Sequence, residues 1–168
     1  ELGITHVFPK IDGTNASVWL EKDGVHAGAR TREATREKDN QGFAEFVFGD
    51  PKGMFLQDLL FNSLHLRLYG EWLVPHTFKG YRQDAWRHFY VFDVFNDNTN
   101  QYLSYDQYQP LLDQFGVEYI PPLAIIKNAD YERFLGAIKN NFFLCPDGGE
   151  AGEGIVIKNY DYQNKFGR

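Results

Sequence analysis

A lysine two residues before an aspartate is the first group in this chain that could do chemistry. The run Lys10-Ile11-Asp12-Gly13 places an amine close to a carboxylate, and its glycine lets the backbone turn tightly or approach a ligand closely. A lysine amine is a nucleophile only in its unprotonated form. The pattern predicts either a nucleophilic lysine whose neighbouring carboxylate holds a metal or orients the site, or an ordinary surface turn.

Three further carboxylates lie at or inside apolar runs typical of strands. Glu71 follows Gly70, and Glu153 precedes Gly154. A carboxylate at a strand end, beside a glycine, could face a cleft as a hydrogen-bond acceptor or Mg²⁺ ligand, or could simply lie in a solvent-facing turn. Asp93 lies within an aromatic run, where burial would be costly unless a partner satisfied the carboxylate.

The positions of Glu153 and Lys158 around one short strand conflict with a shared site. If Ile155 and Ile157 face the core, strand alternation puts Glu153 on their side and Lys158 on the other. Both charged residues could face one cleft only if the strand twists or the backbone bends at Gly154. The sequence leaves this conflict open.

The elements that must position these residues follow from hydrophobic periodicity and turn signals. We expect strands at Val18–Glu21 and Val25–Thr31, which would form a hairpin, at Leu64–Leu73, at Phe89–Phe95 as a buried strand, and at Ile155–Ile157. Helices are expected at Phe43–Phe48 and Met54–Phe61 with a break between them, after Ser104 as far as Gly116, and around Tyr131–Ile138. Residues 32–41 are expected to form a mobile loop. Without a regular βαβ alternation, the class should be α+β.

Composition bounds the class of protein without deciding its partner. The chain has 168 residues, of which 43% are hydrophobic, enough for one domain with a sizeable core. Its net charge of −6 argues mildly against nucleic acid, although basic residues gather at 30–38 and 79–88. Cys145 is the single cysteine, which favours a reducing compartment. With no apolar run of membrane-spanning length, we expect a soluble, intracellular, cytoplasmic protein, with a viral or phage origin as one option.

Taken together, five segments resemble the superfamily of covalent nucleotidyltransferases, which comprises ATP-dependent RNA ligases, DNA ligases and mRNA capping enzymes. The phage-type RNA ligase 2 branch is the most similar, since Asn15 in the first motif is not generally shared by the other branches. The resemblance implies a nucleotidyltransferase fold, with twisted, mainly antiparallel sheets flanked by helices around a nucleotide cleft. In chain order the segments are Lys10-Ile11-Asp12-Gly13-Thr14-Asn15, Arg30, Tyr69-Gly70-Glu71, Phe92-Asp93 and Glu153–Lys158.

The resemblance also implies a role for each matching residue. Lys10 would take AMP from ATP as a covalent lysyl-AMP, and Glu153 would support catalysis and the metal, Mg²⁺ or Mn²⁺. Phe92 would stack on the purine, Glu71 would contact the ribose, and Arg30 would lie near the nucleotide phosphate or the acceptor end.

Three other residues are assigned on the same basis. Lys158 would contact the nucleotide, and Asp12 and Asn15 would make contacts with RNA or contacts specific to one step. The partners implied are ATP and the 5′-phosphate and 3′-hydroxyl ends of RNA, with no membrane. The sequence does not indicate an oligomeric state.

The chain departs from the family pattern at its end. The last family motif, a pair of lysines on a strand beyond Lys158, is not evident, and Lys165 follows too closely to take that role. We therefore expect one nucleotidyltransferase domain over residues 1–168, cut short before the last motif and any C-terminal domain. Three alternatives stay open: a DNA ligase, a capping enzyme that uses GTP, and an inactive nucleic-acid-binding module.

Overall fold

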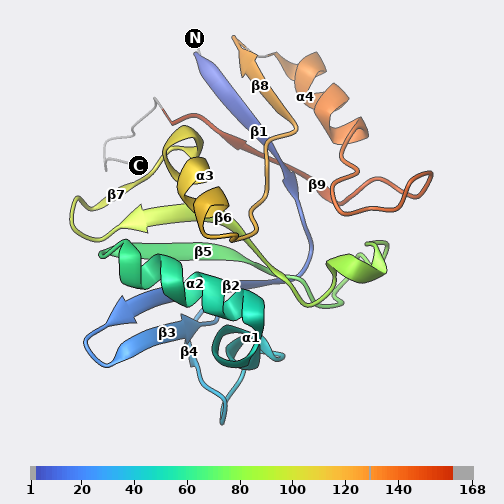
Figure 1. Cartoon of the computed structure of the whole chain (residues 1–168). Coiled ribbons are helices and arrows are strands. Elements are labelled where there is room, and N and C mark those ends of the chain that lie inside the picture. Colours follow the sequence, from blue (N-terminus) through green and yellow to red (C-terminus); the bar gives the residue numbers. More distant parts are fainter. Residues whose placement is uncertain (1–2, 129, 161–168) are drawn as a thin grey trace. The chain divides into compact units, whose positions relative to one another are not determined.

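The computed structural model describes residues 3–128 and 130–160, which belong to two compact units (Figure 1). Unit 1 is built from Glu1–Asp12, Pro75–Trp86 and Ile120–Arg168, and unit 2 from Gly13–Val74 and Arg87–Tyr119. Each unit has its own antiparallel sheet. The single domain predicted over residues 1–168 stays a prediction, and Lys165 lies outside the described residues.

The sheet of unit 2 has six strands in the order β4-β3-β2-β5-β6-β7. The predicted hairpin is confirmed, because β2 pairs with β3 around a turn at Lys22 and Asp23. The predicted strands β5 and β6 are confirmed as antiparallel neighbours. The six strands are β2 (Thr14–Glu21), β3 (Gly24–Gly28), β4 (Glu33–Ala34), β5 (Leu66–Trp72), β6 (Phe89–Asn96) and β7 (Gln101–Tyr102).

Unit 2 has three helices, and the second and third have clear start signals in the sequence. The three helices are α1 (Phe43–Gly49), α2 (Pro51–Asn62) and α3 (Tyr105–Gln114). The Asp50 carboxylate accepts the Lys52 amide at the start of α2, and Pro51 occupies the first helical turn. The two predicted helices with a break between them are confirmed, but the break is Asp50 alone and not residues 50–53, because Pro51 begins α2. Ser104 caps α3 as expected, in a capping box with Gln107.

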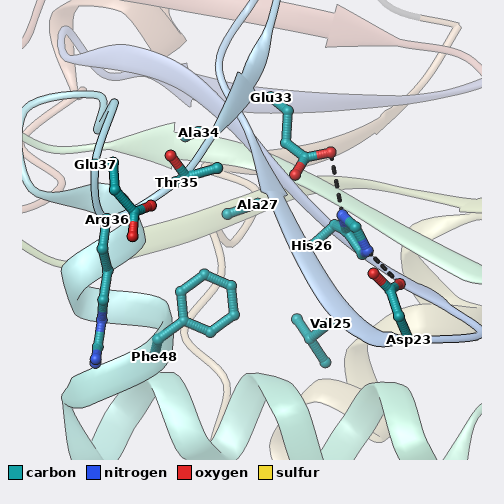
Figure 2. Close-up of a pocket in the computed structure, with 10 residues that line it drawn as sticks. All are labelled: Asp23, Val25, His26, Ala27, Glu33, Ala34, Thr35, Arg36, Glu37 and Phe48. Carbon is teal, nitrogen blue, oxygen red and sulfur yellow. Dashed lines mark hydrogen bonds and ion pairs between the residues drawn. The ribbon is translucent and has the colours of Figure 1, made fainter.

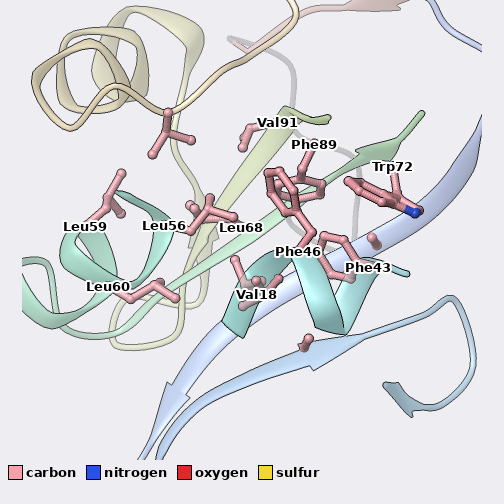
Figure 3. Close-up of a cluster of buried hydrophobic side chains, with 14 of the residues drawn as sticks. Val18, Phe43, Phe46, Leu56, Leu59, Leu60, Leu68, Trp72, Phe89 and Val91 are labelled. Atoms are coloured by element: carbon pink, nitrogen blue, oxygen red, sulfur yellow. The ribbon is translucent and has the colours of Figure 1, made fainter. Parts of the chain in front are cut away.

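The hydrophobic core of unit 2 lies between these helices and one face of the sheet (Figure 3). Every second residue of β5 is buried in it, because side chains alternate between the two faces of a strand. The residues on the other face of β5, Arg67, Tyr69 and Glu71, are half-buried. The labelled members of the core in Figure 3 are Val18, Phe43, Phe46, Leu56, Leu59, Leu60, Leu68, Trp72, Phe89 and Val91.

The expectation of a mobile loop over residues 32–41 is wrong for Glu33–Ala34, which form the edge strand β4. The Arg32 guanidinium also orders the segment by donating hydrogen bonds to the backbone oxygens of Lys38 at 2.6 Å and Asp39 at 2.7 Å. Arg32, one of the basic residues in the cluster at 30–38, therefore stabilises the backbone of this segment.

Unit 1 contains a three-stranded sheet in the order β8-β1-β9, with a helix and a short 3₁₀ segment. The predicted amphipathic helix and the strand after Gly152 are confirmed as α4 and β9. Two strands that the periodicity did not indicate, β1 and β8, pair with each other. The elements are β1 (Ile4–Lys10), η1 (Gln83–Ala85), β8 (Ala124–Lys127), α4 (Tyr131–Lys139) and β9 (Gly154–Lys158).

The predicted α+β class with mainly antiparallel sheets and flanking helices is confirmed. None of the helices within residues 3–128 and 130–160 has both the length and the hydrophobicity needed to cross a membrane.

Core packing in unit 2 can be tested with two leucines that differ in burial. Leu68 is fully buried in β5, whereas Leu64 is 60% exposed. Leu68→Ala should lower the free energy of unfolding by about 2–5 kcal/mol, because it removes transfer energy and leaves a cavity. Leu64→Ala should change it by about 0.5 kcal/mol or less. Urea denaturation measures both, and equal effects would contradict the assigned core.

Candidate active site

Lys10 and Glu153 come together at paired ends of two strands in unit 1. Lys10 is the last residue of β1 and is the register partner of Gly154, the first residue of β9. The Lys10 Nζ lies 4.0 Å from Glu153 Oε1, with the two side chains 55% and 38% exposed. The pair therefore presents an amine and a carboxylate side by side, both accessible to a ligand.

The strand register resolves the conflict between Glu153 and Lys158. Lys10, Phe8 and His6 pair with Gly154, Val156 and Lys158, so that these residues share one face of the sheet. The Lys158 ammonium lies over the Phe8 ring, 4.7 Å from its centroid. Glu153 precedes β9, so the alternation of side chains along the strand does not determine which face Glu153 lies on.

Asp12 is buried in unit 1 and holds a segment distant in the sequence. Its Oδ2 accepts the Thr77 amide at 2.8 Å and the Phe78 amide at 2.7 Å, while Oδ1 lies 2.8 Å from His76 Nδ1. The Asp12 amide in turn donates to the hydroxyl of Tyr81 at 2.8 Å. These bonds favour the orienting role for Asp12, and a direct contact with RNA stays a prediction.

Tyr81 is a residue of this segment that sequence reasoning missed. Its side chain is buried, and burial raises the pKa of its phenol above the ordinary value. The hydroxyl therefore stays neutral while it accepts the bond from Asp12. No local pattern could have identified this pair, because the two residues are 69 positions apart.

In unit 2, Glu71 is the centre of a polar network on the sheet face opposite the core. Its Oε2 accepts the Gly13 amide at 3.1 Å. With the Asn15 amide oriented to satisfy its neighbours, Asn15 donates to Glu71 Oε1 at 2.9 Å and accepts from the Arg30 guanidinium at 2.8 and 3.1 Å. The structure thus brings three of the predicted residues, Asn15, Arg30 and Glu71, into one chain of contacts.

Gly13 is required for packing against the neighbouring strand. A Cβ at this position would lie 2.3 Å from the backbone oxygen of Trp72. The close approach expected for this glycine is therefore to the backbone of unit 2.

Phe92 is the extra residue of a β-bulge. Tyr69 pairs with Asp93 and Gly70 pairs with Val91, so the register with β5 passes over Phe92. The bulge shifts the alternation, so that Asp93 shares the open face with Tyr69 and is only half-buried. The prediction that the whole of Phe89–Phe95 is a buried strand is therefore wrong for Phe92, Asp93 and Phe95, which are half-buried. Desolvation at this face raises the pKa of the Tyr69 phenol.

The predicted residues thus form two groups. Lys10, Asp12, Glu153 and Lys158 belong to unit 1, and Asn15, Arg30, Glu71 and Phe92 belong to unit 2. The chain passes from one unit to the other directly after Asp12. An accessible lysine beside a carboxylate, in a chain with mainly antiparallel sheets, is what the resemblance to covalent nucleotidyltransferases implies.

Comparison with protein-family models identifies the branch. The model of the RNA ligase family matches residues 5–168, and the chain therefore belongs to the RNA ligase family. Comparison with curated proteins gives no significant match.

Solved structures share the fold. Naegleria gruberi RNA ligase with PPi superposes with a TM-score of 0.71 at 23% identity, covering 96% of this chain and 48% of that chain. A mutant of that ligase with ATP and Mn has a TM-score of 0.73 at 23% identity, covering 95% of this chain and 47% of that chain. Another mutant, with AMP and Mn, has a TM-score of 0.71 at 24% identity, with 95% and 47% covered. The chain spans about half the length of these solved structures.

The role of Asp12 can be tested by amide hydrogen exchange. Asp12→Ala removes the acceptor of the Thr77 and Phe78 amides. Loss of these two charge-assisted bonds should accelerate exchange at both amides and lower the free energy of unfolding by at least about 1.5–3 kcal/mol, the contribution of one such bond. Asp147→Ala, at an exposed turn, is the control and should change neither. Retained protection at both amides in Asp12→Ala would contradict the positioning role.

The constraint on Gly13 gives a second measurement. Gly13→Ala should destabilise unit 2 by at least about 1–3 kcal/mol, because the added methyl group would overlap backbone that cannot move independently. Gly136→Ala is the matched control, since nothing lies within 4 Å of its Cβ and alanine favours the helix. Thermal unfolding should separate the two variants by several degrees, and equal melting temperatures would refute the constraint.

Proposed function

We propose that this chain is the nucleotidyltransferase part of an ATP-dependent RNA ligase, which forms a lysyl-AMP on Lys10. The observation that carries the proposal is the Lys10 amine 4.0 Å from the Glu153 carboxylate, on an accessible edge of a chain that belongs to the RNA ligase family. The sequence of the first motif, including Asn15, supports the RNA ligase branch.

The first step is an in-line substitution at phosphorus. The unprotonated Lys10 amine attacks the α-phosphate of ATP and a P–N bond forms. The bond from the α-phosphorus to the bridging oxygen breaks, and pyrophosphate leaves. The amine loses a proton as the phosphoramidate forms. Because the Lys10 side chain is more than half exposed, it can reach a nucleotide without rearrangement of β1.

A divalent cation fits the donor chemistry beside Lys10. Carboxylate oxygen is the ligand that Mg²⁺ and Mn²⁺ prefer, and the partly exposed Glu153 offers it. When bound, the cation would neutralise phosphate charge and favour the unprotonated amine. The solved Naegleria gruberi ligase structures with ATP and Mn support this choice of ions.

The residues of unit 2 would bind the nucleotide and the acceptor. Glu71, already held by Asn15 and the Gly13 amide, would accept from the ribose hydroxyls. Phe92 would offer its half-buried ring to adenine, and Arg30 would contact phosphate. Lys158 would add a further positive charge for the nucleotide.

Two further steps would complete strand sealing. AMP passes from Lys10 to the 5′-phosphate of an RNA strand, forming a 5′–5′ phosphoanhydride. The 3′-hydroxyl of the other RNA end then attacks the 5′-phosphate that carries AMP, so that a phosphodiester forms and AMP leaves. We further propose that the protein acts inside the cell, which its single cysteine supports.

Covalent labelling tests the proposal directly. After incubation with ATP and Mg²⁺ or Mn²⁺, intact mass should increase by one AMP, and peptide mapping should place it on Lys10. Lys10→Ala should abolish the labelled species, whereas Lys22→Ala, at the exposed hairpin turn, should leave it unchanged. Label retained in Lys10→Ala would refute the assignment.

The labelling assay with other nucleotides, together with an assay of strand sealing, distinguishes the alternatives. Labelling by GTP in place of ATP would identify a capping enzyme, and sealing of nicked DNA but not of nicked RNA would identify a DNA ligase. Absence of label with every nucleotide, also in a longer chain that includes the last family motif, would favour an inactive nucleic-acid-binding module.

A further inference from the structure

Three carboxylates surround one imidazole at the β2–β3–β4 end of unit 2. Figure 2 shows His26 joined to Asp23 on one side and to Glu33 on the other. His26 Nε2 lies 2.6 Å from Asp23 Oδ1 and 2.9 Å from Glu21 Oε2, and Nδ1 lies 3.1 Å from Glu33 Oε1. Asp23, His26 and Glu33 also line an open hollow of about 280 Å³.

This arrangement has more acceptors than one imidazole can satisfy. Each ring nitrogen carries at most one proton, yet two anionic oxygens lie within 2.9 Å of Nε2. Even a protonated His26 would leave the cluster with a net charge of −2. Arg36, which lines the same hollow, forms its ion pair with Glu45. A second positive charge would therefore be stabilised here.

The imidazole is held in place by its neighbours in the sheet. Its side chain is 15% exposed and stacks on Trp19, with ring centroids 5.8 Å apart and an interplanar angle of 21°. The Arg67 guanidinium lies 4.8 Å from the Trp19 centroid. The strand register pairs Trp19 with His26 and Gly28 with Glu33, so that the ladder positions the donors. The imidazole is therefore fixed in advance, which lowers the entropy that it loses on binding an ion.

We propose that Glu21, His26 and Glu33 bind a first-row divalent metal ion, Zn²⁺ or Mn²⁺, with Asp23 as an additional oxygen donor. One ligand atom from each of the three residues lies within 4.8 Å of the others. Two donors on one ion lie roughly 3–3.5 Å apart at ligand distances of about 2.0–2.2 Å, so the exposed carboxylate side chains have to rotate toward one nitrogen of the ring to complete the site. A mixed imidazole and carboxylate set suits Zn²⁺ or Mn²⁺ better than Mg²⁺.

Such an ion would stabilise the connection between β3 and β4. Glu33 begins β4, and Arg30 lies in the short connection before it. The Arg30 guanidinium bonds to Asn15 and so holds the connection near its start. An ion bound by Glu33 and His26 would hold the same connection where it enters β4. The site uses none of the residues proposed for lysine adenylation, and it does not depend on that activity.

Metal titration of the intact chain tests the site. The Glu153→Gln variant is used as background, which removes the carboxylate proposed to bind the reaction's cation. Zn²⁺ binding measured by isothermal titration calorimetry should show one saturable site. Glu33→Gln and His26→Ala should each weaken it by at least about 10–100-fold, the range seen when support for a metal site is lost. Glu37→Gln, an acid lining the same hollow, is the control and should bind normally.

Paramagnetic broadening by Mn²⁺ locates the ion without relying on stability. Signals of residues around His26 and Glu33 should broaden first, and this should disappear in Glu33→Gln, whose exposed side chain can change without disturbing the core. Absence of saturable Zn²⁺ binding, equal affinity in Glu33→Gln and Glu37→Gln, or broadening centred elsewhere would overturn the proposal.

Discussion

A carboxylate holds the backbone on each side of the peptide bond between Asp12 and Gly13. Before this bond, the Asp12 side chain accepts two amides of the segment after Pro75. After it, Glu71 accepts the Gly13 amide. Bonds between amides and carboxylates contribute about 1.5–3 kcal/mol each, more than neutral hydrogen bonds. The short stretch that joins β1 to β2, directly after Lys10, is therefore ordered by two independent sets of contacts, one in each unit.

This constraint separates the roles of the acidic residues in the motifs. Asp12 is buried and Glu71 is half-buried, and both bind backbone amides. Glu153 is more exposed and lies beside the Lys10 amine. A carboxylate that holds backbone cannot move to follow a reacting phosphate without breaking the fold, whereas an exposed one can. These contacts support a positioning role for Asp12 and Glu71, whereas Glu153 is accessible beside the Lys10 amine.

Local signals predicted much of this fold, and long-range pairing explains the rest. The capping box at Ser104 and the hairpin turn before Gly24 act over a few residues, so the sequence predicts them well. Pro51 was misread because proline both ends helices and begins them. The bulge at Phe92 depends on how β6 pairs with β5, and no periodicity within one strand indicates it.

The candidate site was predictable to a different degree. The resemblance identified Lys10 and Glu153 by type and order, and the structure places them side by side. The conflict over Lys158 arose because the strand was assumed to include Glu153, although β9 begins one residue later. The partners of Asp12 lie more than 60 positions away, so sequence spacing carries no signal for them.

The negative net charge also has a structural explanation. Several aspartates accept backbone amides: Asp39 accepts from residues 40, 44 and 45, Asp50 from Lys52, and Asp130 from Arg133. The amide dipoles partly compensate a carboxylate held in this way, so its field at a distance is weaker than its formal charge implies. Part of the net charge of −6 is therefore carried by carboxylates that cap helices and turns. Electrostatic attraction for a phosphate depends on the local charges near it, and at Lys10 and Arg30 those include accessible cations.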